Sequence, residues 1–128
     1  MSSVPAFLSQ QARQVAQSLL TAIDGTRAVV VATADGFDLV QVGYSGVEAS
    51  RLAAMVSSFA ALGDAASRES GLGTPRCLVI DSTDGRLMVR CMQVRDHAIV
   101  VVVVTDKTAL LGLVWNHLAA AEKTMNAE

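Results

Sequence analysis

The sequence predicts an α/β domain of the α+β type, built as a three-layer α/β/α sandwich around a five-stranded, mostly antiparallel sheet. Two Asp-Gly pairs, Asp35-Gly36 and Asp84-Gly85, each separate apolar, β-branched runs, which is the strongest short-range signal for a hairpin. The run 98–104 is uninterrupted by polar residues and rich in valine, so it predicts a central strand covered by helices on both faces. With the helical segments around the hairpins, the element order is α-β-β-α-β-β-β-α.

The first helix is expected from Pro5 to about Asp24. Proline suits the first turn of a helix, and Gly25 is a typical residue to end one. One side of this helix is apolar, as expected for a helix that lies on a sheet. Its apolar residues are Leu8, Ala12, Val15, Leu19 and Ile23.

The first hairpin joins strands at 27–34 and 37–42 across Asp35-Gly36. The first of these strands is apolar on both faces. The second alternates, and its Asp38 and Gln41 indicate a lightly covered strand or an edge strand.

The second helix is expected from Val47 to about Ser70 and has two distinct faces. A wide stripe of bulky residues predicts contact with the sheet: Leu52, Met55, Val56, Phe59, Leu62 and Ala66. Small residues repeat on the opposite side: Ala54, Ser58, Ala61 and Ala65. Long charged side chains are scarce there, so this small-residue seam favours close approach of another helix over a solvated face filled with compact residues.

The second half of the chain predicts a hairpin of strands 77–81 and 87–93 around Asp84-Gly85, the central strand, and a last helix. Arg76, Arg86 and Arg90 give the hairpin a partly solvated or partner-facing edge. Thr105 or Asp106 is expected to cap the last helix, and residues 122–128 are expected to fray. The apolar face of the last helix comprises Leu110, Leu111, Val114, Leu118, Ala121 and Met125.

Composition and length favour one domain, 1–128, that is unusually rich in apolar residues. Hydrophobic residues make up 52% of the chain and charged residues 17%, so either the interior is unusually apolar or a partner covers part of the surface. The ten Lys and Arg are scattered and the net charge is −2, which disfavours a nucleic-acid partner. The first residues lack a signal-peptide pattern and the run 98–104 is too short for membrane insertion, so we expect a cytoplasmic protein.

No catalytic constellation is visible, and we expect neither an enzyme nor a cofactor or metal site. His97 and His117 have no carboxylate at a spacing that would orient them, and turn chemistry accounts for Asp35 and Asp84.

Cys77 and Cys91 fall in the two arms of the second hairpin. A disulfide is conceivable if the register places them opposite each other, but the spacing and the expected compartment favour two reduced thiols. A zinc site is disfavoured because the chain has no CxxC motif.

The order of these elements resembles the Roadblock/LC7 family, and in particular its bacterial branch of partners of Ras-like GTPases. The matching segments are 29–37, 52–62, 77–92 and 99–114. The resemblance implies a profilin-like fold without an active site, and a homodimer that joins central helices and an edge strand across a two-fold axis. The implied dimer residues are Ala54, Ser58, Ala61, Ala65, Cys77, Leu78, Val79 and Ile80.

The expected function is therefore that of a non-catalytic regulator or scaffold that binds a small Ras-like GTPase and modulates its nucleotide cycle. Arg51, Arg86 and Arg90 are the candidates to meet acidic side chains on that partner. The alternative is a small-ligand sensor of PAS or GAF type. Such domains enclose their ligand and carry helices mainly on one face, whereas the central strand here requires cover on both faces and aromatic residues are only 4%.

Overall fold

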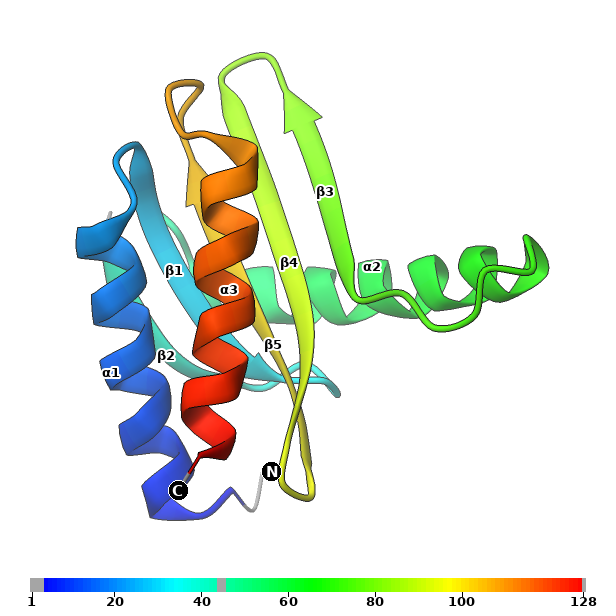
Figure 1. The fold of residues 1–128 in the computed structure, drawn as a ribbon, viewed down its shortest axis with the longest axis horizontal. Helices are drawn as coiled ribbons and strands as arrows, with labels where there is room; N and C mark the ends of the chain where they lie inside the picture. Colours follow the sequence, from blue (N-terminus) through cyan, green and yellow to red (C-terminus); the bar gives the residue numbers. More distant parts are fainter. Residues whose placement is uncertain (1–3, 44–45, 128) are drawn as a thin grey trace.

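A computed structural model describes residues 4–43 and 46–127, and these form three helices and one five-stranded sheet (Figure 1). The strand order is β2-β1-β5-β4-β3, and every neighbouring pair is antiparallel. The elements are α1 (Ala6–Ala22), β1 (Thr26–Thr33), β2 (Asp38–Gly43), α2 (Ala49–Glu69), β3 (Cys77–Ser82), β4 (Gly85–Val94), β5 (His97–Thr105) and α3 (Leu111–Asn126).

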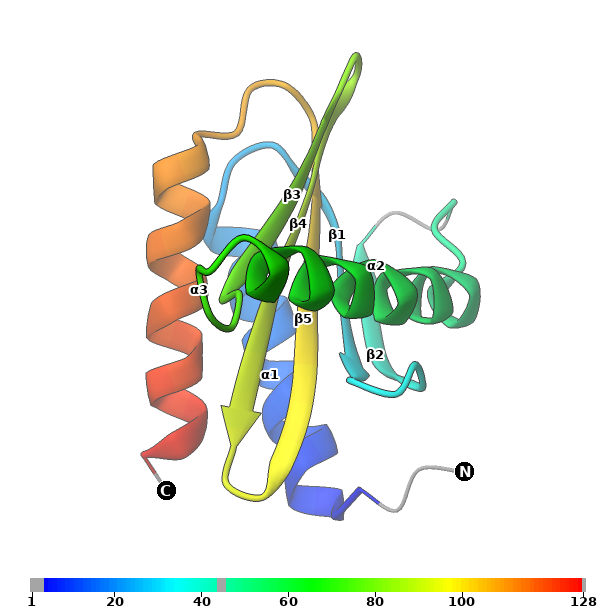
Figure 2. The ribbon, with the colours of Figure 1, turned by 90° about the vertical axis from the view of Figure 1, so that its right-hand side faces the viewer.

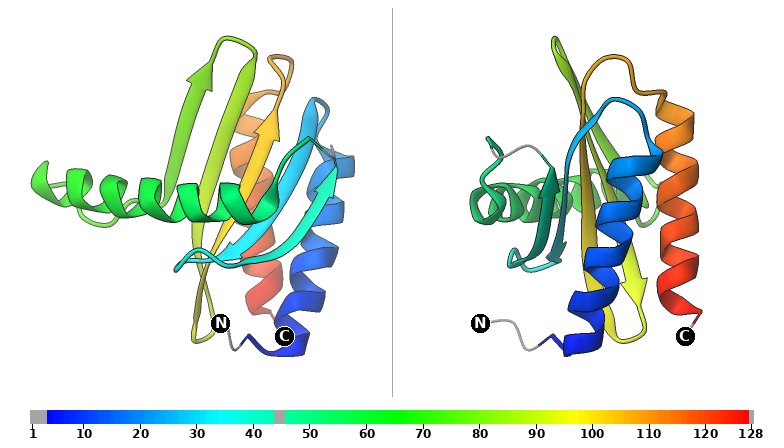
Figure 3. Two further views of the ribbon diagram at one scale, coloured as in Figure 1. Left: turned by 180° about the vertical axis from the view of Figure 1, so that it is seen from behind. Right: turned by 90° about the vertical axis from the view of Figure 1, so that its left-hand side faces the viewer.

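The helices cover both faces of the sheet, which confirms the three-layer sandwich. Helices α1 and α3 lie side by side on one face, and α2 crosses the other (Figures 2 and 3). The core is divided accordingly into a large apolar cluster under α1 and α3 and a smaller one under α2. The layer that contains α2 therefore buries fewer core residues.

Strand β5 occupies the centre of the sheet, as its sequence predicts. Ile99, Val101 and Val103 enter the cluster under α1 and α3. Val100 and Val102, which alternate with them, enter the cluster under α2. All five side chains are buried, and each contributes roughly 1.5–3 kcal/mol of hydrophobic stabilisation. A polar side chain at any of these five positions would therefore be buried in the core.

The first hairpin turns where expected, through a loop at 34–37. Gly36 has a φ of +103°, a conformation that favours glycine, and the Thr33 backbone N–H donates a hydrogen bond to the Phe37 carbonyl oxygen at 2.8 Å. This loop also contacts α2, because the Ser57 hydroxyl donates a hydrogen bond to the Ala34 carbonyl oxygen at 2.8 Å.

The second hairpin turns one residue earlier than expected. Ser82 pairs with Gly85, so the two-residue turn is Thr83-Asp84, and Gly85 is the first residue of β4. A Cβ atom on Gly85 would overlap the carbonyl oxygen of Thr105 on β5. Glycine is therefore required here by the close approach of β4 to β5, and not by the turn.

Helix α3 begins later than expected, at Leu111, and neither Thr105 nor Asp106 caps it. Its N-cap is Leu110, which makes no side-chain capping hydrogen bond. Asp106 instead closes a turn in the preceding loop: its Oδ1 accepts hydrogen bonds from the Thr108 backbone N–H at 2.8 Å and hydroxyl at 2.6 Å. These bonds favour the ionised carboxylate and lower the pKa of Asp106.

Helix α3 continues to Asn126, and its end protects a sheet edge. The expectation that residues 122–126 fray is therefore wrong. Glu128 lies outside the described residues. Strand β4 extends past the start of β3, which exposes backbone groups of Gln93 and Arg95. The Asn126 side-chain amide donates to the Gln93 carbonyl oxygen and accepts from the Arg95 N–H, both at 3.0 Å. Glu122 Oε2 accepts from the Gln93 N–H at 3.4 Å.

Replacing Asn126 with alanine should lower the free energy of unfolding by about 1 kcal/mol, since it removes both hydrogen bonds at an edge that water reaches. Urea denaturation monitored by circular dichroism measures this. Lys123→Ala, on the exposed side of the same helix, is the matched control and should change stability by less than about 0.5 kcal/mol. Equal stability of the two variants would show that solvent replaces the Asn126 side chain without loss.

Candidate functional site

Helix α2 crosses the strands at a steep angle and continues beyond the edge strand β3 (Figure 1). Small residues bring it close to the sheet: Ala53 is fully buried, and a Cβ atom on Gly63 would lie 2.6 Å from Cδ2 of Leu78 on β3. The helix passes over the edge of the sheet at Gly63 and extends six residues further, to Glu69. Its last turns therefore have no sheet of their own chain beneath them.

The solvent face of α2 is wider and more apolar than expected. The predicted small-residue seam, Ala54, Ser58, Ala61 and Ala65, is exposed along its whole length. The expectation that the bulky stripe packs against the sheet is wrong for Met55 and Leu62, which are 61% and 70% exposed, and for Ala66, which is also exposed. Leu52 and Phe59 do pack on the sheet. The reason is that the sheet side of α2 is rotated toward Ala53 and Gly63, where small residues permit close contact.

Strand β3 forms one edge of the sheet and exposes apolar side chains. Val79 and Ile80 are each 43% exposed, while Cys77 and Leu78 are half-buried. Leu78 contacts the cluster under α2, so Leu78 and Ile80 face the α2 layer. Cys77 and Val79 consequently face the layer of α1 and α3.

The backbone of β3 offers a regular set of unpaired groups. The Cys91 N–H donates to the Arg76 carbonyl oxygen at 3.0 Å, which makes these two directly opposed residues a hydrogen-bonded pair. Because such pairs alternate along an antiparallel ladder, Leu78 and Ile80 also direct their backbone groups toward β4. The N–H and C=O groups of the residues between them point outward, away from the sheet. These residues are Cys77, Val79 and Asp81.

Together these features form one candidate interface, here called the α2–β3 surface: the seam residues Ala54, Ser58, Ala61 and Ala65 with the exposed apolar residues Met55, Leu62, Leu72, Val79 and Ile80. An exposed apolar helix face beside an open, apolar strand edge is typical of a surface that contacts another protein. The opposite sheet edge differs, because β2 begins with the exposed, charged Asp38 and its pairing with β1 is irregular between Val31 and Ala32.

The three candidate arginines do not lie together. Arg51 is exposed on α2. Arg86 and Arg90 lie on the other face of the sheet, beside α3, and both are engaged within the chain. Arg86 bonds Asp81 at 3.2 Å and the Ala109 carbonyl oxygen at 3.1 Å.

Arg90 is held by Glu122, whose Oε1 accepts from its Nη2 at 2.9 Å and its Nε at 3.1 Å. Its Nη1 also lies 3.6 Å from the Cys77 sulfur. Partial burial by itself would lower the pKa of Arg90, but the bonds to Glu122 and Cys77 outweigh it and the pKa is raised. The guanidinium therefore stays charged and fixed beside α3.

The two cysteines are free thiols on opposite faces of the sheet. Cys77 lies opposite Arg90 and faces α3, whereas Cys91 packs into the cluster under α2. A disulfide between them is therefore ruled out by the register. Burial raises the pKa of the Cys91 thiol.

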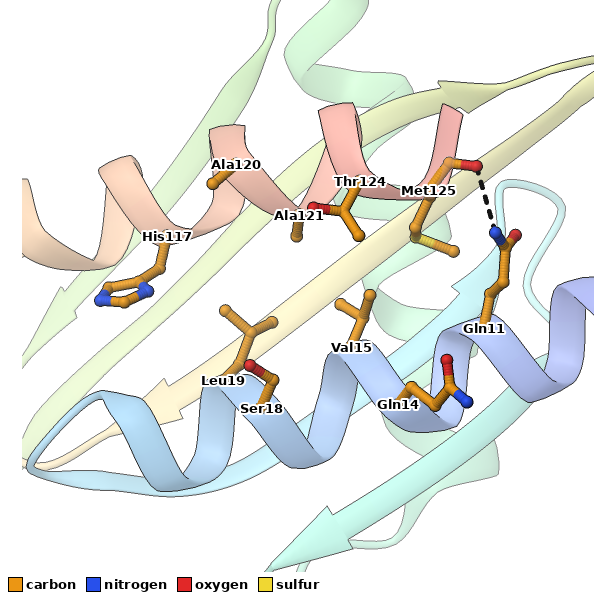
Figure 4. Close-up of a pocket in the computed structure, with 10 residues that line it drawn as sticks. All are labelled: Gln11, Gln14, Val15, Ser18, Leu19, His117, Ala120, Ala121, Thr124 and Met125. Atoms are coloured by element: carbon orange, nitrogen blue, oxygen red, sulfur yellow. Dashed lines mark hydrogen bonds between the residues drawn. The ribbon is translucent and has the colours of Figure 1, made fainter. Parts of the chain in front are cut away.

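A groove of about 320 Å³ runs between α1 and α3 (Figure 4). The Gln11 side-chain amide reaches across its end and donates a hydrogen bond to the Met125 carbonyl oxygen at 3.3 Å. His117 is the one titratable side chain along it, so the groove presents no acid–base pair. Its lining comprises Gln11, Gln14, Val15, Ser18, Leu19, His117, Ala120, Ala121, Thr124 and Met125.

The described residues bring no further reactive groups together. Asp35 and Asp84 lie in turns at opposite ends of the sheet (Figure 1). Within 4–43 and 46–127, no three His, Cys, Asp or Glu side chains are grouped so as to hold a metal ion. The same part of the chain contains no helix with the length and apolarity needed to cross a membrane.

Comparison with known proteins places this geometry in a family. Residues 13–104 match the profile of the Roadblock/LC7 domain. A Roadblock/LC7 domain from Streptomyces avermitilis superposes with a TM-score of 0.78 at 20% identity, over 89% of this chain and 93% of the other. MglB of Myxococcus xanthus gives a TM-score of 0.79 at 14% identity, over 99% and 92%.

The gliding protein MglB of Thermus thermophilus gives a TM-score of 0.78 at 22% identity, over 97% of this chain and 92% of the other. Curated protein sequences give no match. At these identities the solved structures establish a shared fold. Since the profile match spans well over half of the sequence, the chain belongs to the Roadblock/LC7 domain family.

Proposed function

We propose that this protein is a non-catalytic, homodimeric regulator that binds a small Ras-like GTPase and modulates its nucleotide cycle. The observation that carries the proposal is the α2–β3 surface, an apolar helix face and an unpaired strand edge on a domain whose described residues group no metal-binding side chains. Membership of the Roadblock/LC7 family supports it, as does the fold shared with two MglB proteins.

In the proposed dimer, the seam on α2 packs against its two-fold mate and β3 pairs with β3 of the second copy. Alanine and serine along the seam allow two helix backbones to approach closely. The same contact would cover Met55 and Leu62, the most exposed large apolar side chains of α2. The interface thus accounts for the surplus of apolar residues in the composition.

To regulate a GTPase, the dimer must bind the GDP-loaded and the GTP-loaded GTPase with different affinities. Only such a difference in affinity shifts the equilibrium between the two nucleotide states. Of the three candidate arginines, Arg51 suits this role best. It is exposed on α2, on the side of the seam but N-terminal to it, so it lies at the rim of the proposed dimer contact. Arg86 and Arg90 already form salt bridges with Asp81 and Glu122, respectively.

The test is calorimetric binding of a Ras-like GTPase encoded by a neighbouring gene, loaded with GDP or with a non-hydrolysable GTP analogue. We expect affinities that differ by roughly tenfold or more between the two states. Arg51→Glu should weaken the tighter complex by roughly tenfold while the dimer persists. Arg13→Glu, on the exposed side of α1, is the matched control and should bind like the wild type.

Equal affinity for both states would reduce the protein to a scaffold. Absence of binding would refute the GTPase proposal and favour the small-ligand sensor, for which the groove between α1 and α3 is the first place to search.

A further inference from the structure

We propose that two copies of this chain pair their β3 strands in one defined register, with the two-fold axis passing between the two Val79 residues. This inference rests on the proposed homodimer and specifies how its strands must meet. It follows from the direction of the backbone groups of β3 and from the side chains between them.

The backbone limits the register first. In β3 the groups of Cys77, Val79 and Asp81 point outward, whereas those of Leu78 and Ile80 are used by β4. In an antiparallel pair, outward-pointing residues must face outward-pointing residues. The two-fold axis therefore lies between one residue of the strand and the same residue of the second copy. It never lies level with the midpoint between two consecutive residues.

Among the permitted registers, one uses every outward-pointing residue. With the axis at Val79, Cys77 faces Asp81 of the second copy, Val79 faces its own mate, and Asp81 faces Cys77. All three outward-pointing residues of each strand then exchange hydrogen bonds. An axis at Leu78 or Ile80 leaves one such residue of each strand unpaired, and an axis at Cys77 or Asp81 leaves two.

The side chains select the same register. With the axis at Val79, Leu78 lies opposite Ile80 of the second copy, twice by symmetry, in the closely spaced non-hydrogen-bonded positions on the α2 side. Moving the axis to Ile80 would place Leu78 opposite Ser82. The Val79 axis therefore matches apolar residues with apolar residues throughout the centre of the strand.

Neighbouring elements confine the pairing to β3. The exposed edge of β4 beyond β3 is already satisfied by Glu122 and Asn126, so a second copy finds open backbone groups along β3 and not at Gln93 or Arg95. The last turns of α2 project past β3 (Figure 1). In the proposed pairing they would lie above the β3 strand of the second copy.

Spin labels placed one at a time on β3 test this register. Labels are attached to the native Cys77, to Val79→Cys and to Asp81→Cys; Cys91→Ala is present in all three, and Cys77→Ser in the latter two. Dipolar broadening of the continuous-wave electron paramagnetic resonance spectrum, which is sensitive at short range, ranks the distances between the two copies of each label. A label on Asp38→Cys, at the other sheet edge, is the control and should lie much farther from its mate.

The Val79 axis predicts the shortest distance at Val79, where the Cα atoms lie about 5.5 Å apart. It also predicts equal distances at Cys77 and Asp81, with backbones roughly 14 Å apart. A shorter distance at Asp81 than at Cys77 would place the axis nearer Ile80, and the reverse would place it nearer Leu78. Either result overturns the register but leaves the dimer intact.

Oxidative cross-linking gives a second readout that does not depend on a bulky label. In a chain carrying Cys77→Ser and Cys91→Ala, the pair Leu78→Cys and Ile80→Cys should form a covalent dimer, since opposed non-hydrogen-bonded positions lie within disulfide reach. Ile80→Cys alone should cross-link roughly tenfold more slowly or less. Faster cross-linking of that single variant would refute the Val79 axis. Wild-type protein that sediments as a monomer would refute the dimer itself, which is a distinguishable failure.

Discussion

Replacing Ala61 with glutamate should convert the protein from dimers to monomers at tens of micromolar. Ala61 lies near the middle of the exposed seam on α2, where the proposed partner helix approaches closely. A carboxylate there would be buried without a counter-charge, which costs several kcal/mol. A loss of this size weakens association by roughly a hundredfold or more. Sedimentation velocity across a concentration series measures the shift.

Gln17→Glu is the matched control for this experiment, because it adds the same charge to an exposed position of α1, in the opposite layer. It should sediment like the wild type. The circular dichroism spectrum of the Ala61→Glu monomer should match the wild type, since the single chain leaves position 61 exposed. A dimer that tolerates Ala61→Glu would place the α2 seam outside the interface.

Replacing Gly85 with alanine should destabilise the fold by about 2–3 kcal/mol. The added Cβ atom would overlap the Thr105 carbonyl oxygen, which belongs to the backbone of the central strand and cannot rotate away. Relief requires the start of β4 to move from β5, and this weakens the pairing of Arg86 with Thr105. Thermal and urea denaturation measure the loss.

Gly112→Ala provides the contrast within the same chain. Gly112 lies in the first turn of α3, and apart from its chain neighbours and the backbone of its own helix no atom lies within 4 Å of a Cβ added there. Alanine should therefore stabilise the protein by about 0.5 kcal/mol through its higher helix propensity. If the two substitutions had similar effects, the close approach at Gly85 would not limit the packing of the sheet.

The order and type of the elements could be predicted because they depend on local patterns. An uninterrupted valine-rich run can only be satisfied in the middle of a sheet with helices on both faces, and β5 lies there. The exposed seam on α2 could also be predicted, since small residues at helical spacing without long charged neighbours are visible in the sequence.

The predictions that were wrong concern features that depend on tertiary packing. Met55 and Leu62 fit an apolar stripe, but the helix rotates so that Ala53 and Gly63 meet the sheet, and no local pattern shows how closely the layers approach. Asp84-Gly85 has the composition of a turn, whereas Gly85 is needed for its contact with β5.

The engagement of Arg90 with Glu122 joins residues 32 positions apart, and its effect on the surface available to a partner follows from the fold alone. The same holds for Asn126, whose role at the edge of β4 becomes visible only when α3 is laid against the sheet.

The pairing rule for β3 also has a consequence for assembly size. A strand that pairs with its own copy about a two-fold axis consumes its free edge, so the joined sheet presents only the two β2 edges to further chains. Those edges begin with a charged residue, Asp38, and pair irregularly with β1, which discourages the addition of another strand. In the proposed dimer, growth of the sheet would therefore stop at two copies, and an apolar chain with an open strand edge would avoid forming open-ended fibres.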